Sequence, residues 1–322
     1  MSTESFLSLI RILIVLFLML MVGFFARKKG IIDTAASKKL SALIVNIGQP
    51  AMIMNPLFKV DFEKNAAIEG LTMFLIGIGV HVFCCVFAFF AVKIFKDPDE
   101  RKISEFSIIF ANAGFIGFPI LTSVFGDIGT FWGCFYIVAF HLFVWTWGVM
   151  ILARKREDIR LTPKKIVFNF GTMPCLIGFV LYAANIPLPD FGYQLASYLT
   201  NICTPISIII SGANIARRSL KTMLTNKNVY AVNLVKLLVM PLCVSTLLWT
   251  LGMPDYMIVF AAVMAAMPCP AVVTMFGELY RISPGYAAEL VGSSTIFCTF
   301  TILPAVTFAQ FLAAHPLAVL IA

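Results

Sequence analysis

The sequence predicts an all-α polytopic membrane protein with about ten transmembrane helices. Hydrophobic residues make up 60% of the 322 positions and charged residues only 12%, with a mean hydropathy of +0.95. A soluble domain is usually about a quarter charged. Apolar runs of about 20 residues, each long enough to cross a bilayer, recur along the chain with short connections. We therefore expect no separate soluble domain.

The ten expected spans follow one another without a long interruption. Their ranges are 6–26, 39–58, 68–94, 104–125, 130–153, 165–185, 194–216, 229–252, 256–280 and 287–313. The first run is too long for a signal-peptide core, and no basic segment precedes it, so we interpret it as the first span.

Basic residues alternate between the connections. Of the 24 Lys and Arg residues, 20 lie in the loops after odd-numbered spans or at the span ends that border these loops, namely Lys39, Lys93 and Lys165, and two lie in the loops after even-numbered spans. The other two, Arg11 and Lys236, fall inside spans. The positive-inside rule then places the odd loops in the cytoplasm and both termini outside the cell membrane.

Composition also argues against several function classes. The net charge of +8 resides in short loops beside the bilayer, so it does not indicate nucleic-acid binding. All eight cysteines lie in apolar segments without metal-ligand spacing, and we expect no metal or cofactor. With three scattered histidines and no G-x-S-x-G or H-E-x-x-H motif, an enzyme is not supported.

Span four contains an unusual stretch, Ala111–Pro119, with Asn112, Gly114, Gly117 and Pro119 at its middle. Gly and Pro weaken a helix, and in lipid each freed backbone group needs a partner. Interrupted spans are tolerated where they line a buried cavity, and in many transporters they form the substrate site. A kinked or closely packed helix is the alternative.

A weak internal repeat supplies a partner for this stretch. Residues 40–50 match residues 195–205 without a gap, with four identities and a shift of 155. Five spans separate the copies, which predicts two inverted five-helix repeats, 1–157 and 158–322, unless the similarity is by chance. The same shift places the counterpart of span four's break in span nine, at Met267, Pro268, Cys269 and Pro270.

Further motifs follow one another along the chain, in or just after spans one, two, four, eight and nine. They are Gly23 to Asp33 after span one, Pro50, Asn112 through Gly117-Phe118-Pro119, Lys236 with Pro241, Ala266-Met267-Pro268, and Phe276 to Tyr280. Together they resemble the auxin efflux carrier family, which includes bacterial permeases for malonate and malate and the plant PIN carriers.

The resemblance implies a fold like that of bile-acid symporters and sodium/proton antiporters. Spans four and nine would break and cross at mid-membrane. Spans one, two, six and seven would form a scaffold, also used for homodimerisation, and the other six a mobile unit. The implied function is elevator-like transport of a small organic anion, such as malonate, malate or an auxin-like acid.

Two departures from the family matter. Plant members have a proline where this chain has Ala111, so we expect span four to be less sharply broken and to open at Gly114, Gly117 and Pro119. Plant carriers also have a membrane-embedded acidic residue near the site. We identify no Asp or Glu deep in spans one to eight, which leaves the coupling ion, proton or sodium, unassigned.

Broken helices at mid-membrane favour an anionic ligand, because half-helix N-termini present N–H groups and partial positive charge. We expect Asn112 to donate to a carboxylate, with Cys269 and nearby backbone N–H groups opposite. Four polar residues beside prolines are expected to line the other wall or to bond neighbouring helices. They are Asn46, Gln49, Asn201 and Thr204.

Two ionisable residues inside spans have open alternatives. His141, in span five, resembles the position of a substrate-proximal glutamine in plant carriers; it either binds the anion or is satisfied by a backbone carbonyl. Lys236, in span eight, either snorkels or makes a structural hydrogen bond, or it supplies fixed positive charge beside the crossing.

The leading hypothesis is a secondary carrier. A membrane sensor that binds the same ligand without moving it is the alternative, although no signalling domain accompanies the spans. A channel is less compatible with broken midplane helices.

Overall fold

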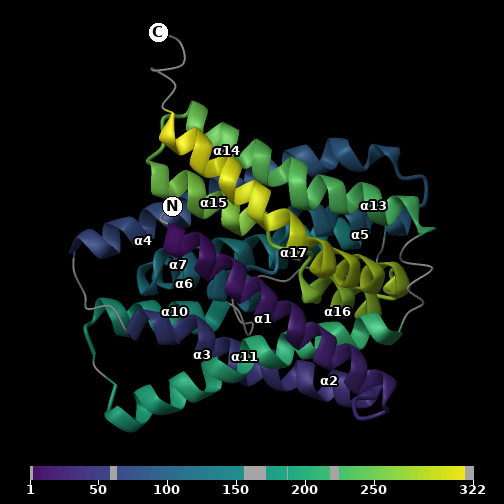
Figure 1. Cartoon of the computed structure of the whole chain (residues 1–322), viewed down its shortest axis with the longest axis horizontal. Helices are drawn as coiled ribbons and strands as arrows, with labels where there is room; N and C mark the ends of the chain where they lie inside the picture. Colours follow the sequence, from purple (N-terminus) through teal and green to yellow (C-terminus); the bar gives the residue numbers. More distant parts are fainter. Residues whose placement is uncertain (1–2, 59–63, 156–171, 187, 218–224, 316–322) are drawn as a thin grey trace. The chain divides into compact units, whose positions relative to one another are not determined.

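Every regular element in the described part of this computed structural model is helical (Figure 1). The structure describes residues 3–58, 64–155, 172–186, 188–217 and 225–315. The all-α prediction is confirmed for these residues.

The helices of the first half are α1 (Thr3–Lys28), α2 (Thr34–Leu43), η1 (Ile44–Gly48), α3 (Gln49–Met54), η2 (Asn55–Phe58), α4 (Lys64–Ala91), η3 (Val92–Ile94), α5 (Pro98–Ile109), η4 (Ala113–Gly117), α6 (Phe118–Phe125), α7 (Asp127–Phe143), η5 (Val144–Gly148) and α8 (Val149–Ala153). Those of the second half are α10 (Thr172–Ala183), α11 (Asp190–Arg217), α13 (Lys227–Leu234), η6 (Val235–Val239), α14 (Met240–Thr250), α15 (Asp255–Ala265), α16 (Ala271–Leu279) and α17 (Pro284–Ala314).

Eight helical segments of the described chain are long and apolar enough to cross a membrane. They correspond to the expected spans one to five, seven, eight and ten. For span six, only α10 falls in the described residues, and 165–171 lie outside them. Span nine is divided into α15 and α16. A multi-pass membrane protein is therefore supported, and ten spans remain a prediction.

Three helices change to a wider, π-helical turn just before a proline. The turns η1, η4 and η6 end two residues before Pro50, Pro119 and Pro241 respectively. A proline has no N–H, and its ring clashes with the carbonyl four residues earlier. The wider turn moves that carbonyl away from the ring, so each span continues past its proline.

The chain divides into two compact units. The first consists of Met1–Phe17, Gly79–Ala113 and Arg218–Ala322, and the second of Leu18–Ile78 and Gly114–Arg217. This division differs from the scaffold and mobile unit that the resemblance implies, because span five belongs with the second unit, where α7 packs against α10. The predicted repeat boundary at 157 lies outside the described residues, and the repeats stay a prediction.

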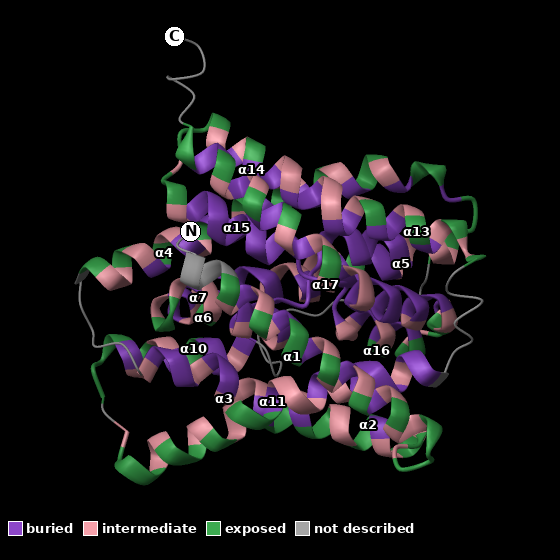
Figure 2. Cartoon of the chain, in the orientation of Figure 1, coloured by how far each residue is buried: buried purple, intermediate pink, exposed green. Residues whose placement is uncertain are grey.

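In the first unit, α17 packs against α5, α13, α14, α15 and α16 (Figure 1). Figure 2 shows α5 and α15 as largely buried. Residues Met257–Ala265 of α15 are buried without exception, as are Ile103–Ile109 of α5. These two helices precede the two interruptions, so each break begins in the core of the unit.

In the second unit, α1 and α11 approach through glycines. A Cβ atom on Gly212 would lie 1.9 Å from the Leu20 carbonyl oxygen, and one on Gly23 would lie 1.9 Å from the Ile209 oxygen. Small residues allow such close packing of membrane helices. The backbone of each helix therefore fills the space that a side chain of the other would need.

We expect Gly212→Ala to destabilise the protein, because a methyl group there must displace main-chain atoms. Overpacking of this kind costs about 1–3 kcal/mol. Gly79→Ala is the matched control, since a Cβ at this exposed helical glycine has nothing within 4 Å. Thermal unfolding in detergent should show a lower midpoint for Gly212→Ala only. Equal midpoints would contradict the close contact.

Candidate functional site

Span four is interrupted at Phe110–Asn112, where α5 has ended and η4 has not begun. Phe110 has an extended backbone, with φ −94° and ψ 149°. The expectation that Gly114, Gly117 and Pro119 open this span is wrong, because all three lie within helical backbone. The wide turn η4 absorbs Pro119, and the break falls upstream, beside Ala111.

Span nine is interrupted at 266–270, between α15 and α16. Pro268 and Pro270 have no N–H to continue a helix. Pro270 is extended, with φ −75° and ψ 142°, and precedes the first turn of α16. The whole interruption is buried, including Met267 and Cys269. This break lies where the sequence predicts it.

The two interruptions of the first unit are joined by a hydrogen bond. The Asn112 main-chain N–H donates to the Pro268 carbonyl oxygen at 2.8 Å. Segments more than 150 residues apart in the chain therefore lie in direct contact. The bond satisfies one donor and one acceptor that the two broken helices leave without intrahelical partners.

The interruptions also hold donors without partners among the described residues. The Asn112 side chain is 5% exposed, and its amide makes no hydrogen bond to this part of the chain. At the start of α16, the same holds for the N–H groups of Ala271 and Val272, while Val273 bonds Pro270. Such a helix N-terminus favours an anion.

Cys269 is expected to face a carboxylate opposite Asn112, but its two donors point to groups of the protein. Its main-chain N–H donates to Ser294 Oγ at 3.0 Å, and its thiol lies 3.8 Å from the Ser107 carbonyl oxygen. Both donors are therefore engaged within the protein. The N–H groups that have no partner within the described residues are those of Ala271 and Val272, two and three residues further along the chain.

Lys236 is buried in η6, with only 1% of its surface exposed, so the snorkelling interpretation is wrong. Its ammonium donates to the Ile108 carbonyl oxygen at 3.3 Å. Ile108 lies in the last turn of α5, where carbonyls lack intrahelical partners. The structural hydrogen bond is thus confirmed, and it places a cation at a helix C-terminus.

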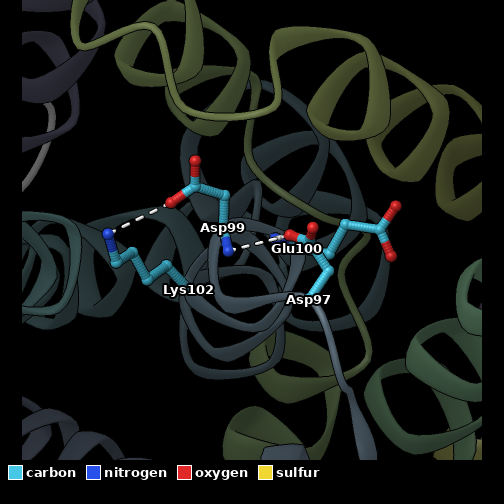
Figure 3. A network of polar contacts seen from close by, with 4 residues as sticks. All are labelled: Asp97, Asp99, Glu100 and Lys102. Atoms are coloured by element: carbon cyan, nitrogen blue, oxygen red, sulfur yellow. Dashed lines mark hydrogen bonds and ion pairs between the residues drawn. The ribbon is translucent and has the colours of Figure 1, made fainter.

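The opposite end of α5 has complementary charges. Asp97 accepts from the N–H groups of Asp99 and Glu100 at 2.9 and 2.8 Å, which caps the helix N-terminus. Asp99 also pairs with Lys102 at 3.2 Å (Figure 3). Acidic groups at the N-terminus and Lys236 at the C-terminus both match the helix dipole.

The charge of Lys236 has no carboxylate partner within the described chain. The ionisable groups that act on it electrostatically are the thiols of Cys84, Cys269 and Cys298. Burying an ammonium costs several kcal/mol, and a helix C-terminus returns up to about 2 kcal/mol. Lys236 therefore lacks a neighbouring carboxylate within the described residues, which favours binding of an anion beside it.

Further buried polar groups escaped the sequence analysis. Ser107 Oγ and Asn233 Oδ1 are buried without a partner, although Asn233 donates to Ser293 Oγ at 2.8 Å. Asn233 lies one helical turn before Lys236, a spacing that the sequence does contain. Glu105, at the start of the expected span four, is also 0% exposed, so a carboxylate is buried at the edge of that span.

The second unit brings together two of the expected side chains. Gln49 Nε2 and His141 Nε2 lie 3.0 Å apart, and His141 is 5% exposed. With the amide in this orientation Gln49 donates, so His141 accepts and is neutral, since an imidazolium has no acceptor. His141 is thus satisfied by a side chain and not by the expected backbone carbonyl.

Thr204 has a structural partner in the second unit. Its hydroxyl donates to the Phe115 carbonyl oxygen at 3.0 Å. Phe115 is four residues before Pro119, which has no N–H to offer that carbonyl. Thr204 replaces the missing hydrogen bond. It therefore bonds a neighbouring helix, which is one of the two expectations for this residue. Asn46 and Asn201 are exposed and make no hydrogen bond to the described residues.

The site residues of the sequence analysis are thus distributed over both units. Asn112 and the four residues from Met267 to Pro270 lie in the first, and the other eight lie in the second. Within the described ranges no group of three His, Cys, Asp or Glu side chains could hold a metal ion. Among the described residues, the first unit combines free donors with a buried cation that has no carboxylate partner.

Comparison with known proteins gives a match over most of the chain. The model of the family described as "Membrane transport protein" matches residues 8–305. The chain belongs to this family. It is the auxin efflux carrier family that the sequence motifs resemble.

Two other proteins are similar in sequence to this chain over much of its length. A protein of Methanothermobacter thermautotrophicus named "uncharacterized transporter" is 21% identical over 306 residues, covering 92% of this chain and 94% of the relative. One of Methanocaldococcus jannaschii, also named an uncharacterized transporter, is 27% identical over 228 residues, covering 65% and 70%. Both names agree with a membrane transporter and not with an enzyme.

We expect His141→Leu to lower stability and His141→Gln to preserve it. Leucine leaves the half-buried Gln49 amide without its partner, which costs about 1–3 kcal/mol, whereas glutamine can still accept a hydrogen bond. Thermal unfolding of the three proteins in detergent checks this. A His141→Leu protein as stable as the wild type would show that the Gln49 contact contributes nothing.

Proposed function

We propose that this membrane transport protein is a secondary carrier of a small organic anion, a mono- or dicarboxylate such as malonate, malate or an auxin-like acid. The single observation behind the choice of an anion is Lys236, a buried ammonium without a carboxylate partner in the described chain. The free Ala271 and Val272 N–H groups and the Asn112 amide supply donors in the same unit.

The proposed chemistry is binding without covalent change. A carboxylate oxygen accepts from the N-terminus of α16 and from Asn112, and Lys236 offsets its charge. Apolar packing around the interruptions excludes water, which strengthens these interactions. Interrupted helices at a binding site are typical of alternating-access carriers, and this supports an elevator-like cycle.

Three further features belong to the proposal. The two inverted repeats, 1–157 and 158–322, supply the symmetry for alternating access. The 20-to-2 distribution of loop charges supports insertion in the cell membrane with both termini outside. The family resemblance supports a homodimer.

Reconstitution in proteoliposomes tests the function. Labelled malonate, malate, lactate and indole-acetate are offered under imposed pH, sodium and voltage gradients. Protein-dependent counterflow of at least one acid is expected. If an acid binds but no counterflow of any acid is measured, the carrier proposal is wrong and the sensor alternative holds.

Asn112→Ala should weaken binding of the transported acid. Removing a hydrogen bond to a charged group costs about 1.5–3 kcal/mol, which is roughly 10-fold to 100-fold in the dissociation constant. The fold should persist, since the bond to Pro268 uses the Asn112 main chain. Counterflow half-saturation measures the effect, and Asn65→Ala, at an exposed position of α4, is the control. Unchanged half-saturation would place the site elsewhere.

A further inference from the structure

Lys236 is a buried titratable group that donates to the helix end just before Asn112, and the proposed function so far uses only its charge. We propose that Lys236 carries a coupling proton, so that each substrate molecule crosses the membrane together with one proton. This inference rests on the proposed carrier function and deepens it, because it names the coupling ion.

The surroundings of Lys236 make its charge dependent on a ligand. The side chain is 1% exposed. Within the described chain it donates to the Ile108 carbonyl, and its electrostatic neighbours are three thiols. A buried amine keeps its proton most easily when an anion lies close by. Bound carboxylate therefore favours protonation, and by thermodynamic reciprocity protonation favours binding of the carboxylate.

The position of Lys236 links it to both interruptions. Its hydrogen-bond acceptor, Ile108, lies four residues before Asn112, and its electrostatic neighbour Cys269 lies two residues before Ala271. The bond to Ile108 requires only an N–H. It therefore persists with a neutral amine or an ammonium, and the side chain stays in place when its charge changes.

Other titratable groups near Lys236 or on helices packed in the same unit are the alternative candidates for carrying the coupling proton. The titratable groups that act on Lys236 are the thiols of Cys84 from α4, Cys269 from the break, and Cys298 from α17. Two buried carboxylates on packed helices have other neighbours: Glu105 acts on the Cys85 thiol, and Glu289 acts on the Tyr286 hydroxyl. On α14, Cys243 acts on Cys84.

Three further groups lie on helices that bond, influence or adjoin Lys236: His81 on α4, Ser107 on α5 and Asn233 on α13. His81 of α4 lies against the Phe110 ring, with ring centroids 6.1 Å apart. Ser107 Oγ and Asn233 Oδ1, both buried without a partner, are uncharged and can receive hydrogen bonds from the ammonium or the substrate.

The proposed step is balanced in atoms and charge. On one side of the membrane the lone pair of the Lys236 amine takes a proton from water, forming one N–H bond, and the carboxylate binds. On the other side the carboxylate leaves, that N–H bond breaks, and the proton returns to water. No oxidant, reductant or covalent intermediate is involved.

The test measures accumulation of the labelled acid that shows counterflow, in proteoliposomes clamped at zero voltage. With one proton per molecule, each pH unit of imposed gradient should raise the inside-to-outside ratio by about tenfold. Protein-free liposomes correct for passive entry. A ratio that stays at one while counterflow continues overturns the proton coupling. Absence of counterflow with every acid instead overturns the proposed carrier function.

Two variants assign the coupling to Lys236. Lys236→Arg keeps a permanent charge, and Lys236→Met keeps the unbranched shape without a charge. We expect neither variant to accumulate substrate under a pH gradient, and we expect the counterflow of Lys236→Arg not to change with that gradient. Lys227→Gln, at an exposed position at the start of α13, should accumulate substrate like the wild type.

The same variants can contradict the assignment of proton coupling to Lys236. Gel filtration and thermal unfolding establish which of them fold, and Lys236→Met is the more conservative in volume. Accumulation of about tenfold per pH unit by either folded variant would overturn the assignment, because neither side chain can gain and lose the proton in this range.

Discussion

Main-chain groups that leave a helix inside a membrane must find new partners, and the interior of this protein is organised around that requirement. Four such groups are satisfied by residues distant in sequence. The Asn112 N–H bonds Pro268, Lys236 caps Ile108, the Cys298 thiol lies 3.5 Å from the Ala266 carbonyl oxygen, and Thr204 caps Phe115. Each replaces a hydrogen bond that a break or a proline removes.

Some main-chain and side-chain donors at the interruptions have no partner within the described protein and are available to a ligand. Carbonyls at the ends of α5 and α15 receive donors from the protein, whereas the first N–H groups of α16 and the Asn112 amide receive no acceptor from the described residues. The first unit therefore presents an excess of donors around a buried cation. An anion would supply the acceptors and the negative charge together, and this supports the proposed carboxylate binding without an arginine in the site.

Much of the architecture could be predicted from the sequence, since it depends on local composition. Long apolar runs predict the helices, and Pro268 with Pro270 predicts the break in span nine, because neither residue can donate to a helix. The break in span four was predicted in the right span but not at the right residues. A wide turn accommodates Pro119, and the contact with Pro268 fixes the interruption at Phe110–Asn112 instead.

By itself, then, the sequence determined the membrane environment, the helical class, the pairing of spans four and nine, and the polar residues near them. Only the tertiary structure decided which of these residues are already occupied: Thr204 by Phe115, His141 by Gln49, and Lys236 by a carbonyl 128 residues away. The reason is physical. Hydrophobicity and helix propensity act over a few turns, whereas the partner of a buried polar group is set by whichever distant segment packs beside it.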